Sequence, residues 1–338
     1  MVETRVVGSL NEENPAKNWR MPLIEARTRY FLVKGERIVR YVLAAWLREK
    51  CGLAVLLLNL HIVYRCVAES ETYHQLYNKS LVDDIFSELS GDFRKAVVLW
   101  TYGPSERDAR LANEALKSKK KTITQLQVIV EIACASSPDH LVAVRQTYRG
   151  LFNCSLEEDI AANAPMPVQK ILIGLARSYR YDKELVDPTT ANKEAAILRE
   201  TIRTKKLDSD NFLLILSTRN VHQLRATFEC YKQNYGFSID QDIKSCGKGL
   251  LESILKVVIW CIDSPEKHFA EVVRASIVGI GTDEDSLTRA IVTRAEVDMM
   301  KVRGEYFIAN KTNLDNAVIG DTSGDYMKFL MTLLGAKV

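Results

Sequence analysis

Four segments of the chain share one spacing pattern, and this repetition constrains the fold more than any other feature of the sequence. Each has a tyrosine in second place and an aliphatic residue 12 positions later: Tyr73 and Ile85, Tyr148 and Ile160, Tyr231 and Ile243, Tyr306 and Val318. The tyrosines lie 75, 83 and 75 residues apart. A regular period of this kind is the signature of an array of similar units.

The units are predicted to be helical. Apolar residues recur at helical spacing, as in Ala96, Val97 and Trp100. No segment shows the alternation of apolar and polar residues that is typical of a half-buried strand. Each unit has room for four or five short helices. The sequence therefore predicts an all-α array of four similar domains, each with a small core of its own.

Composition excludes several other classes of protein. The net charge of the 338-residue chain is only +3, and no basic array interleaved with aromatic residues is present, so no nucleic-acid partner is expected. The seven cysteines are scattered and form no CxxC pair, which favours a reducing compartment. No secretory signal peptide is expected at the N-terminus. The apolar stretch 52–64 is shorter than the ~20 residues of a spanning helix, so we interpret it as a buried core helix.

The segment GIGTDED at residues 279–285 occurs only in the fourth unit. Gly279 and Gly281 can adopt positive φ angles, which would turn backbone carbonyls toward one point. Asp321 follows Thr282 by 39 residues, and the two places can meet if the helical hairpins of the unit pack side by side. Carbonyl and carboxylate oxygens are the ligands that Ca²⁺ prefers. The alternative is a plain turn between helices, with the acids as helix caps.

The residues GIGTDEDSLTRAIVTRAEVDMMKVRGEYF, followed by IGDTSGDYMKFLMTLLG, resemble the last repeat of an annexin, most closely of a plant annexin. The resemblance covers roughly residues 67–338. It implies four repeats of about five helices each in a curved disc, whose convex face docks on acidic phospholipid. It also implies Ca²⁺ as the cofactor. The implied ligands are the carbonyl oxygens of Ile277, Gly279 and Gly281 and the carboxylate of Asp321.

The resemblance suggests the following organisation: an N-terminal segment at 1–30, a divergent first repeat at 31–115, and further repeats at 116–188, 189–270 and 271–338. The corresponding loops of the second and third repeats lack glycine. Their acid positions hold Asn163 and Cys246, so neither repeat is expected to bind calcium. In the first repeat Glu88 keeps the acid position, but Ala44–Glu49 offers no glycine turn. One intact site is therefore expected.

The two glycine-free loops are basic. They contain Lys119, Lys120, Lys121, Arg203, Lys205 and Lys206. The resemblance places them on the lipid-facing side, where each basic residue near an anionic surface can contribute ~1 kcal/mol. The alternative is a solvated loop with no partner.

Three weaker features are interpreted as structural. His61 lies one position from the place of a histidine that has been linked to peroxidase activity in plant annexins. Cys134 and Cys261 match two cysteines suggested to form a redox cluster there, and they also fit small buried core residues. The DTSG segment at 321–324 fits a DxxG pattern, but no phosphate-binding loop accompanies it. No enzymatic activity is expected.

Two functions remain in competition. The first is a cytoplasmic protein that associates reversibly with acidic phospholipid membranes when calcium rises. The second is a calcium-independent scaffold or interaction protein with basic loops that face lipid. The glycine loop together with Asp321 favours the first, because a pure scaffold has no need of that combination.

Overall fold

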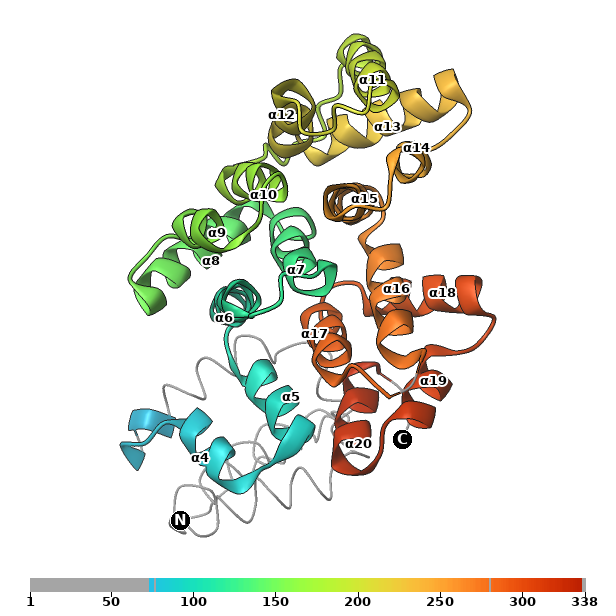
Figure 1. The fold of residues 1–338 in the computed structure, drawn as a ribbon. Coiled ribbons are helices and arrows are strands. Elements are labelled where there is room, and N and C mark those ends of the chain that lie inside the picture. Colours follow the sequence, from blue (N-terminus) through green and yellow to red (C-terminus); the bar gives the residue numbers. More distant parts are fainter. Residues whose placement is uncertain (1–72, 76, 280, 336–338) are drawn as a thin grey trace, which may run out of the picture. The chain divides into compact units, whose positions relative to one another are not determined.

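The computed structural model describes residues 73–75, 77–279 and 281–335. All regular secondary structure in these ranges is helical (Figure 1), which confirms the all-α prediction. None of the helices in these ranges has the length and apolar character needed to cross a bilayer. Some features discussed above lie outside the described residues: the segment 1–30, the loop Ala44–Glu49, the stretch 52–64 and His61.

Three complete groups of five helices follow the end of a first group, as expected of four repeats. The first group ends with α4 (Leu81–Glu88) and α5 (Gly91–Thr101). The second comprises α6 (Pro104–Lys117), α7 (Ile123–Cys134), α8 (Pro138–Phe152), α9 (Leu156–Asn163) and α10 (Val168–Arg177). The third comprises α11 (Pro188–Arg203), α12 (Asp210–Thr218), α13 (Val221–Tyr235), α14 (Ile239–Cys246) and α15 (Leu250–Asp263). The fourth comprises α16 (Pro265–Ile277), α17 (Glu284–Arg294), α18 (Met299–Asn310), α19 (Leu314–Asp321) and α20 (Gly324–Leu333).

Each complete group opens with a proline at its first helical position: Pro104, Pro188 and Pro265. Proline suits this position because the N–H that it lacks has no partner there and its fixed φ angle fits the helix. We propose that the second, third and fourth repeats begin at these prolines. The boundaries expected at residues 115 and 270 lie inside α6 and α16.

The recurring tyrosines pair with aspartates 11 positions later. In the first three repeats the hydroxyl donates to a carboxylate oxygen: Tyr73 to Asp84, Tyr148 to Asp159 and Tyr231 to Asp242. The latter two bonds are 2.5 Å and 2.7 Å long. In the fourth repeat, Ala317 occupies the aspartate position, so this bond has no counterpart there. The spacing in the sequence thus reflects a hydrogen bond that joins the third helix of a repeat to its fourth.

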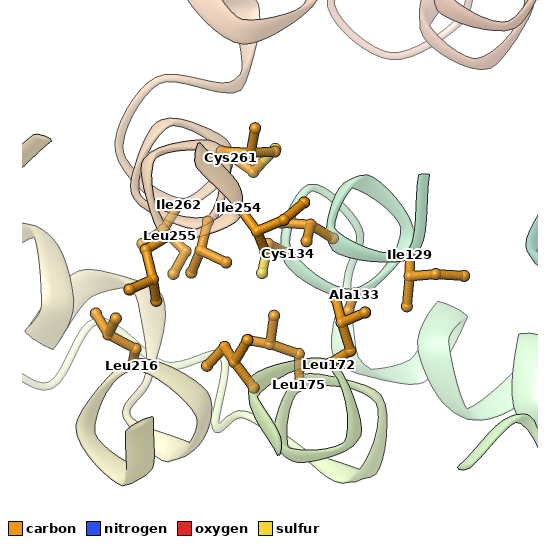
Figure 2. Packing of buried hydrophobic residues seen from close by; sticks show 14 of the residues in the cluster. Ile129, Ala133, Cys134, Leu172, Leu175, Leu216, Ile254, Leu255, Cys261 and Ile262 are labelled. Carbon is orange, nitrogen blue, oxygen red and sulfur yellow. The ribbon is translucent and has the colours of Figure 1, made fainter. Parts of the chain in front are cut away.

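Apolar side chains in the described residues form two buried clusters. One extends from α6 to α15 and unites the second and third repeats, and the other joins α5 to α16–α20. In Figure 2, Cys134 of α7, Leu172 of α10, Leu216 of α12 and Leu255 of α15 lie in the first cluster. The expectation of a separate core in each repeat was therefore wrong. The reason is that α7 and α15 are apolar over most of their surface and pack on each other across the repeat boundary.

A buried polar network connects the second repeat to the fourth. Glu131 of α7 accepts a hydrogen bond of 2.8 Å from His268 Nε2 of α16 and forms an ion pair with Arg289 of α17. All three side chains are no more than 5% exposed. Beside them lies a cavity of about 410 Å³, lined by residues of α6, α7, α8, α16 and α17.

Candidate calcium site

The loop between α16 and α17 leaves the helix through two glycines with positive φ. Helix α16 ends at Ile277, and the N–H of Val278 makes its last helical bond, 3.0 Å to Arg274 O. Gly279 then has a φ of +145° and Gly281 a φ of +87°. A Cβ at either glycine would meet no atom within 4 Å, so glycine is needed for the backbone angle and not for space.

Two hydrogen bonds hold this loop in place. The N–H of Asp283 donates to Ser276 O at 2.8 Å and closes the loop on the end of α16. The hydroxyl of Thr282 donates to Asp321 O at 3.2 Å and lies 3.5 Å from Asp321 Oδ2. Asp321 is the last residue of α19. The structure therefore brings together the two places that are 39 residues apart in the chain.

Two of the acids that follow the glycines have structural roles. The Asp283 carboxylate caps α17 by accepting 3.1 Å from the N–H of Ser286. Asp285 forms an ion pair of 2.8 Å with Lys95 of α5. The expected helix cap is thus present at Asp283, alongside the glycine turn, and Asp285 lies in the first turn of α17. Asp321 remains as the acid that adjoins the loop.

The oxygen donors at this loop suit a hard cation. Gly279, Gly281 and Asp321 are exposed, and Ile277 is half-buried. The described residues contain no group of three or more His, Cys, Asp or Glu side chains that could hold a metal ion. Any calcium site in this region would therefore depend on backbone carbonyls together with one carboxylate, and Ca²⁺ accepts both kinds of oxygen.

Comparison with known proteins identifies the family. A family model described as Annexin matches residues 70–100, 193–258 and 268–333. Annexin D3 of Arabidopsis thaliana is 59% identical over 271 residues, which cover 79% of this chain and 84% of the relative. The chain belongs to the annexin family.

Other annexins support the same assignment. Annexin-like protein RJ4 of Fragaria ananassa is 44% identical over 263 residues, 78% of this chain and 83% of the relative. Among solved structures, chicken annexin V in complex with Zn²⁺ matches with a TM-score of 0.73 and 31% identity, covering 81% of this chain and 86% of that one. A calcium-bound annexin (Sm)1 matches with a TM-score of 0.71 and 25% identity, covering 82% of both chains. The resemblance to plant annexins and the annexin fold are thus confirmed.

Side chains of this annexin occupy the ends of the first helices in its second and third repeats. Lys121 Nζ donates to Ser118 O at 2.6 Å and also to Leu116 O, at the end of α6. In the third repeat, Cys246 Sγ donates to Ile202 O at 3.4 Å, near the end of α11. In these two repeats, protein side chains therefore engage carbonyls close to where the fourth repeat has its glycine loop.

The remaining loop residues of these repeats differ in their surroundings. Lys119, Lys120, Lys205 and Lys206 are exposed. Arg203 donates two hydrogen bonds, of 2.8 Å and 2.9 Å, to the Glu200 carboxylate, so its charge is partly balanced. Asn163 Nδ2, at the acid position of the second repeat, donates to Asp159 O at 2.9 Å. Glu88 is the last residue of α4, and its expected loop partner lies outside the described residues.

Cys134 and Cys261 are free thiols buried in the first apolar cluster. Burial raises the pKa of Cys134 to about 11 and that of Cys261 well above its ordinary value. Since the thiolate is the reactive form, these cysteines have the properties of inert core residues.

The DTSG segment joins α19 to α20. Thr322 Oγ1 donates to Val318 O at 2.6 Å, and Gly324 starts α20 with a φ of +63°. A helix connection therefore accounts for its threonine and its glycine.

The sequence analysis predicted that the places of Thr282 and Asp321 can meet, but it did not single out Val278 or the hydrogen bond from the Thr282 hydroxyl. Val278 is 61% exposed beside the first glycine of the loop. An apolar residue next to a glycine turn is a recognisable signal for an exposed loop tip. The hydroxyl contact depends on how α19 packs, which no local pattern shows.

Proposed function

We propose that this annexin binds acidic phospholipid membranes in a calcium-dependent manner through the α16–α17 loop of its fourth repeat. The calcium ligands are the carbonyl oxygens of Ile277, Gly279 and Gly281 and the carboxylate of Asp321. The observation that carries the proposal is the contact of Thr282 with Asp321 across a loop that contains two positive-φ glycines. Water and a lipid phosphate oxygen supply the rest of the roughly 6–8 oxygens that Ca²⁺ takes.

Helix orientation favours a cation at this point. Helix α16 ends at Ile277 and α19 ends at Asp321, and the Thr282 contact brings these two ends together. Each helix C-terminus carries a partial negative charge of about half a unit and leaves carbonyls without helical partners. These partial charges add to the negative charge of the Asp321 carboxylate.

The exposed Val278 side chain supports a membrane partner. An exposed apolar side chain beside an ion that bridges to phosphate can enter the interface of the bilayer. There it gains part of the free energy of burial, about 25 cal/mol per Å² of apolar surface. We therefore propose reversible association with acidic membranes from the cytoplasm, with a binding role and not a catalytic one, and with no nucleic-acid partner.

Replacing Asp321 by asparagine tests the proposal. The variant keeps the size of the side chain and the backbone oxygen that accepts from Thr282, but it removes the carboxylate charge. We expect the calcium concentration for half-maximal co-sedimentation with phosphatidylserine vesicles to rise at least tenfold, that is, by ~1.4 kcal/mol or more. Glu88→Gln is the matched control and should change little. Superimposable calcium titrations of Asp321→Asn and the wild-type chain would rule out this site.

The second candidate function is that of a calcium-independent scaffold with basic loops that face lipid. The exposure of Lys119, Lys120, Lys205 and Lys206 favours some contribution of this kind. Vesicle binding in the presence of a chelator separates it from the calcium-dependent function.

A further inference from the structure

The end of α6 and the α6–α7 loop contain lysines of two kinds. Lys117 forms an ion pair of 2.7 Å with Asp159, and Lys121 donates to Ser118 O at 2.6 Å and to Leu116 O. Lys119 and Lys120 are exposed, and no ion pair joins either of them to another described residue. Lys121 thus supports the loop from within and Lys117 joins the end of α6 to α9, whereas Lys119 and Lys120 extend into solvent.

The ammonium of Lys121 lies at the C-terminal end of α6, where backbone carbonyls have no N–H donor within the helix. The last carbonyls of a helix have no partner within the helix, and a lysine side chain can satisfy them. Here one ammonium group contacts two carbonyl oxygens, of Leu116 and Ser118, at the end of α6. The hydroxyl of Ser118 donates in turn to Lys120 O at 3.2 Å, which fixes the backbone between the exposed lysines.

The loops of the second and fourth repeats therefore differ in whether a protein side chain donates to the carbonyl oxygens at the end of the first helix. The fourth repeat uses two positive-φ glycines, whereas no residue described between 118 and 122 has a positive φ. Hydrogen bonds from a charged donor are roughly twice as strong as neutral ones. The Lys121 ammonium can thus hold the second loop in one conformation whether or not calcium is present.

We propose that the α6–α7 loop is a calcium-independent docking element for anionic lipid. In it the Lys121 ammonium replaces the ion that the fourth repeat takes from solution, and Lys119 and Lys120 contact lipid phosphates. This inference rests on the proposed function, because it assumes that the loops between the first two helices of the second and fourth repeats face the same membrane.

The surroundings of the exposed pair suit a lipid surface. Ile123, the first residue of α7, is 39% exposed close to Lys119 and Lys120 in sequence. A basic pair next to an exposed apolar side chain matches an interface of charged head groups above acyl chains. Two lysines near an anionic surface correspond to roughly 30-fold in apparent affinity.

The experiment measures binding of the full chain to vesicles in a calcium chelator at low salt. We compare phosphatidylserine-containing vesicles with pure phosphatidylcholine vesicles. The wild-type chain should bind only the anionic vesicles, and 0.5 M NaCl should suppress this binding through screening. The variant with both Lys119→Ala and Lys120→Ala should lose at least tenfold in affinity. It should keep the increase that calcium produces.

Two further variants make the assignment specific. Lys205→Ala with Lys206→Ala removes an exposed pair from the third repeat, where Cys246 and not an ammonium engages the helix-end carbonyl of Ile202. Because that loop is not held by an ammonium, loss of this pair should reduce chelator-resistant binding less than threefold. Lys121→Met keeps most of the length of the side chain and removes the ammonium. We expect it to speed amide hydrogen exchange at residues 118–122 and to weaken chelator-resistant binding.

Several outcomes would overturn the inference. The first is wild-type affinity for anionic vesicles in the Lys119 and Lys120 variant. The second is an equal loss of chelator-resistant binding in the Lys205 and Lys206 variant. The third is unchanged amide hydrogen exchange at residues 118–122 in Lys121→Met. Tighter binding of the wild-type chain to a single-stranded nucleic acid than to the anionic vesicles would reject lipid as the partner. Asp321→Asn distinguishes the two proposals, because it should remove the increase in vesicle binding that calcium produces and leave chelator-resistant binding intact.

Discussion

Replacing Glu131 by glutamine tests the polar network between the second and fourth repeats. Glutamine keeps the shape of the side chain and one acceptor for His268 Nε2, but it removes the charge that balances Arg289. Both Glu131 and Arg289 side chains are only 5% exposed, so bulk solvent has little access to the charge that remains. Arg289 Nη2 already has no hydrogen-bond partner among the described residues.

The expected loss of stability follows from this burial. Removing one partner of a buried ion pair costs about 3–5 kcal/mol, because the other charge remains buried and uncompensated. The adjoining cavity of about 410 Å³ is lined by both apolar and polar side chains, including Arg107, Asp108 and His140, and has room for water, which places the expected loss near the lower end of that range. A loss of about 3 kcal/mol lowers the urea midpoint by roughly 1 M if the slope is about 3 kcal/mol/M.

Urea unfolding of the calcium-free protein, followed by tryptophan fluorescence, measures this loss. The companion variant adds Arg289→Met to Glu131→Gln and removes the stranded charge, so it should recover much of the stability. Glu200→Gln breaks the exposed pair with Arg203, both more than half exposed, and should cost less than ~0.5 kcal/mol. If Glu131→Gln costs less than 1 kcal/mol, or if the double variant is less stable than the single one, the reasoning fails.

Two further predictions concern buried titratable groups. Burial lowers the pKa of His268, so the folded protein holds the imidazole neutral while the unfolded chain protonates it below pH ~6.5. The contribution of His268 to stability is therefore complete above that pH and should decline by up to ~1.4 kcal/mol per pH unit below it. In His268→Gln, the unfolding free energy should depend less steeply on pH between 6.5 and 5. Burial also raises the pKa values of Cys134 and Cys261. In a thiol titration of the native protein, the variant with both cysteines replaced by serine should therefore show as many fast-reacting thiols as the wild-type chain. The loss of two fast-reacting thiols would instead support a redox role.

Local patterns were enough to predict the helices and the repeat. Helical spacing of apolar residues and the tyrosine period both arise from interactions within a repeat, such as the bond of Tyr148 to Asp159. The residues 11 positions after the four tyrosines are aspartates in the first three repeats and Ala317 in the fourth, so the missing bond can be predicted from the sequence. Recurring prolines likewise mark the first helix of each complete repeat.

The interactions between repeats could not be predicted in this way. Glu131 is a single acid within the apolar run QVIVEIAC, which marks it as unusual, but its partners lie 137 and 158 residues away. Lys121 looks like its neighbours in a run of three lysines. Only the position of the α6 carbonyls shows that its ammonium faces inward while Lys119 and Lys120 do not.

The Glu131 network has a consequence for synthesis of the chain. Ribosomes add roughly 5–20 residues per second, so roughly 7–30 seconds separate the appearance of Glu131 from that of His268 and Arg289. During that interval the second and third repeats can form their shared apolar cluster, but the carboxylate must remain hydrated at its surface. A nascent chain stalled before residue 268 should therefore expose a face on α7 that the finished protein buries, and this face is a natural site for a chaperone to bind.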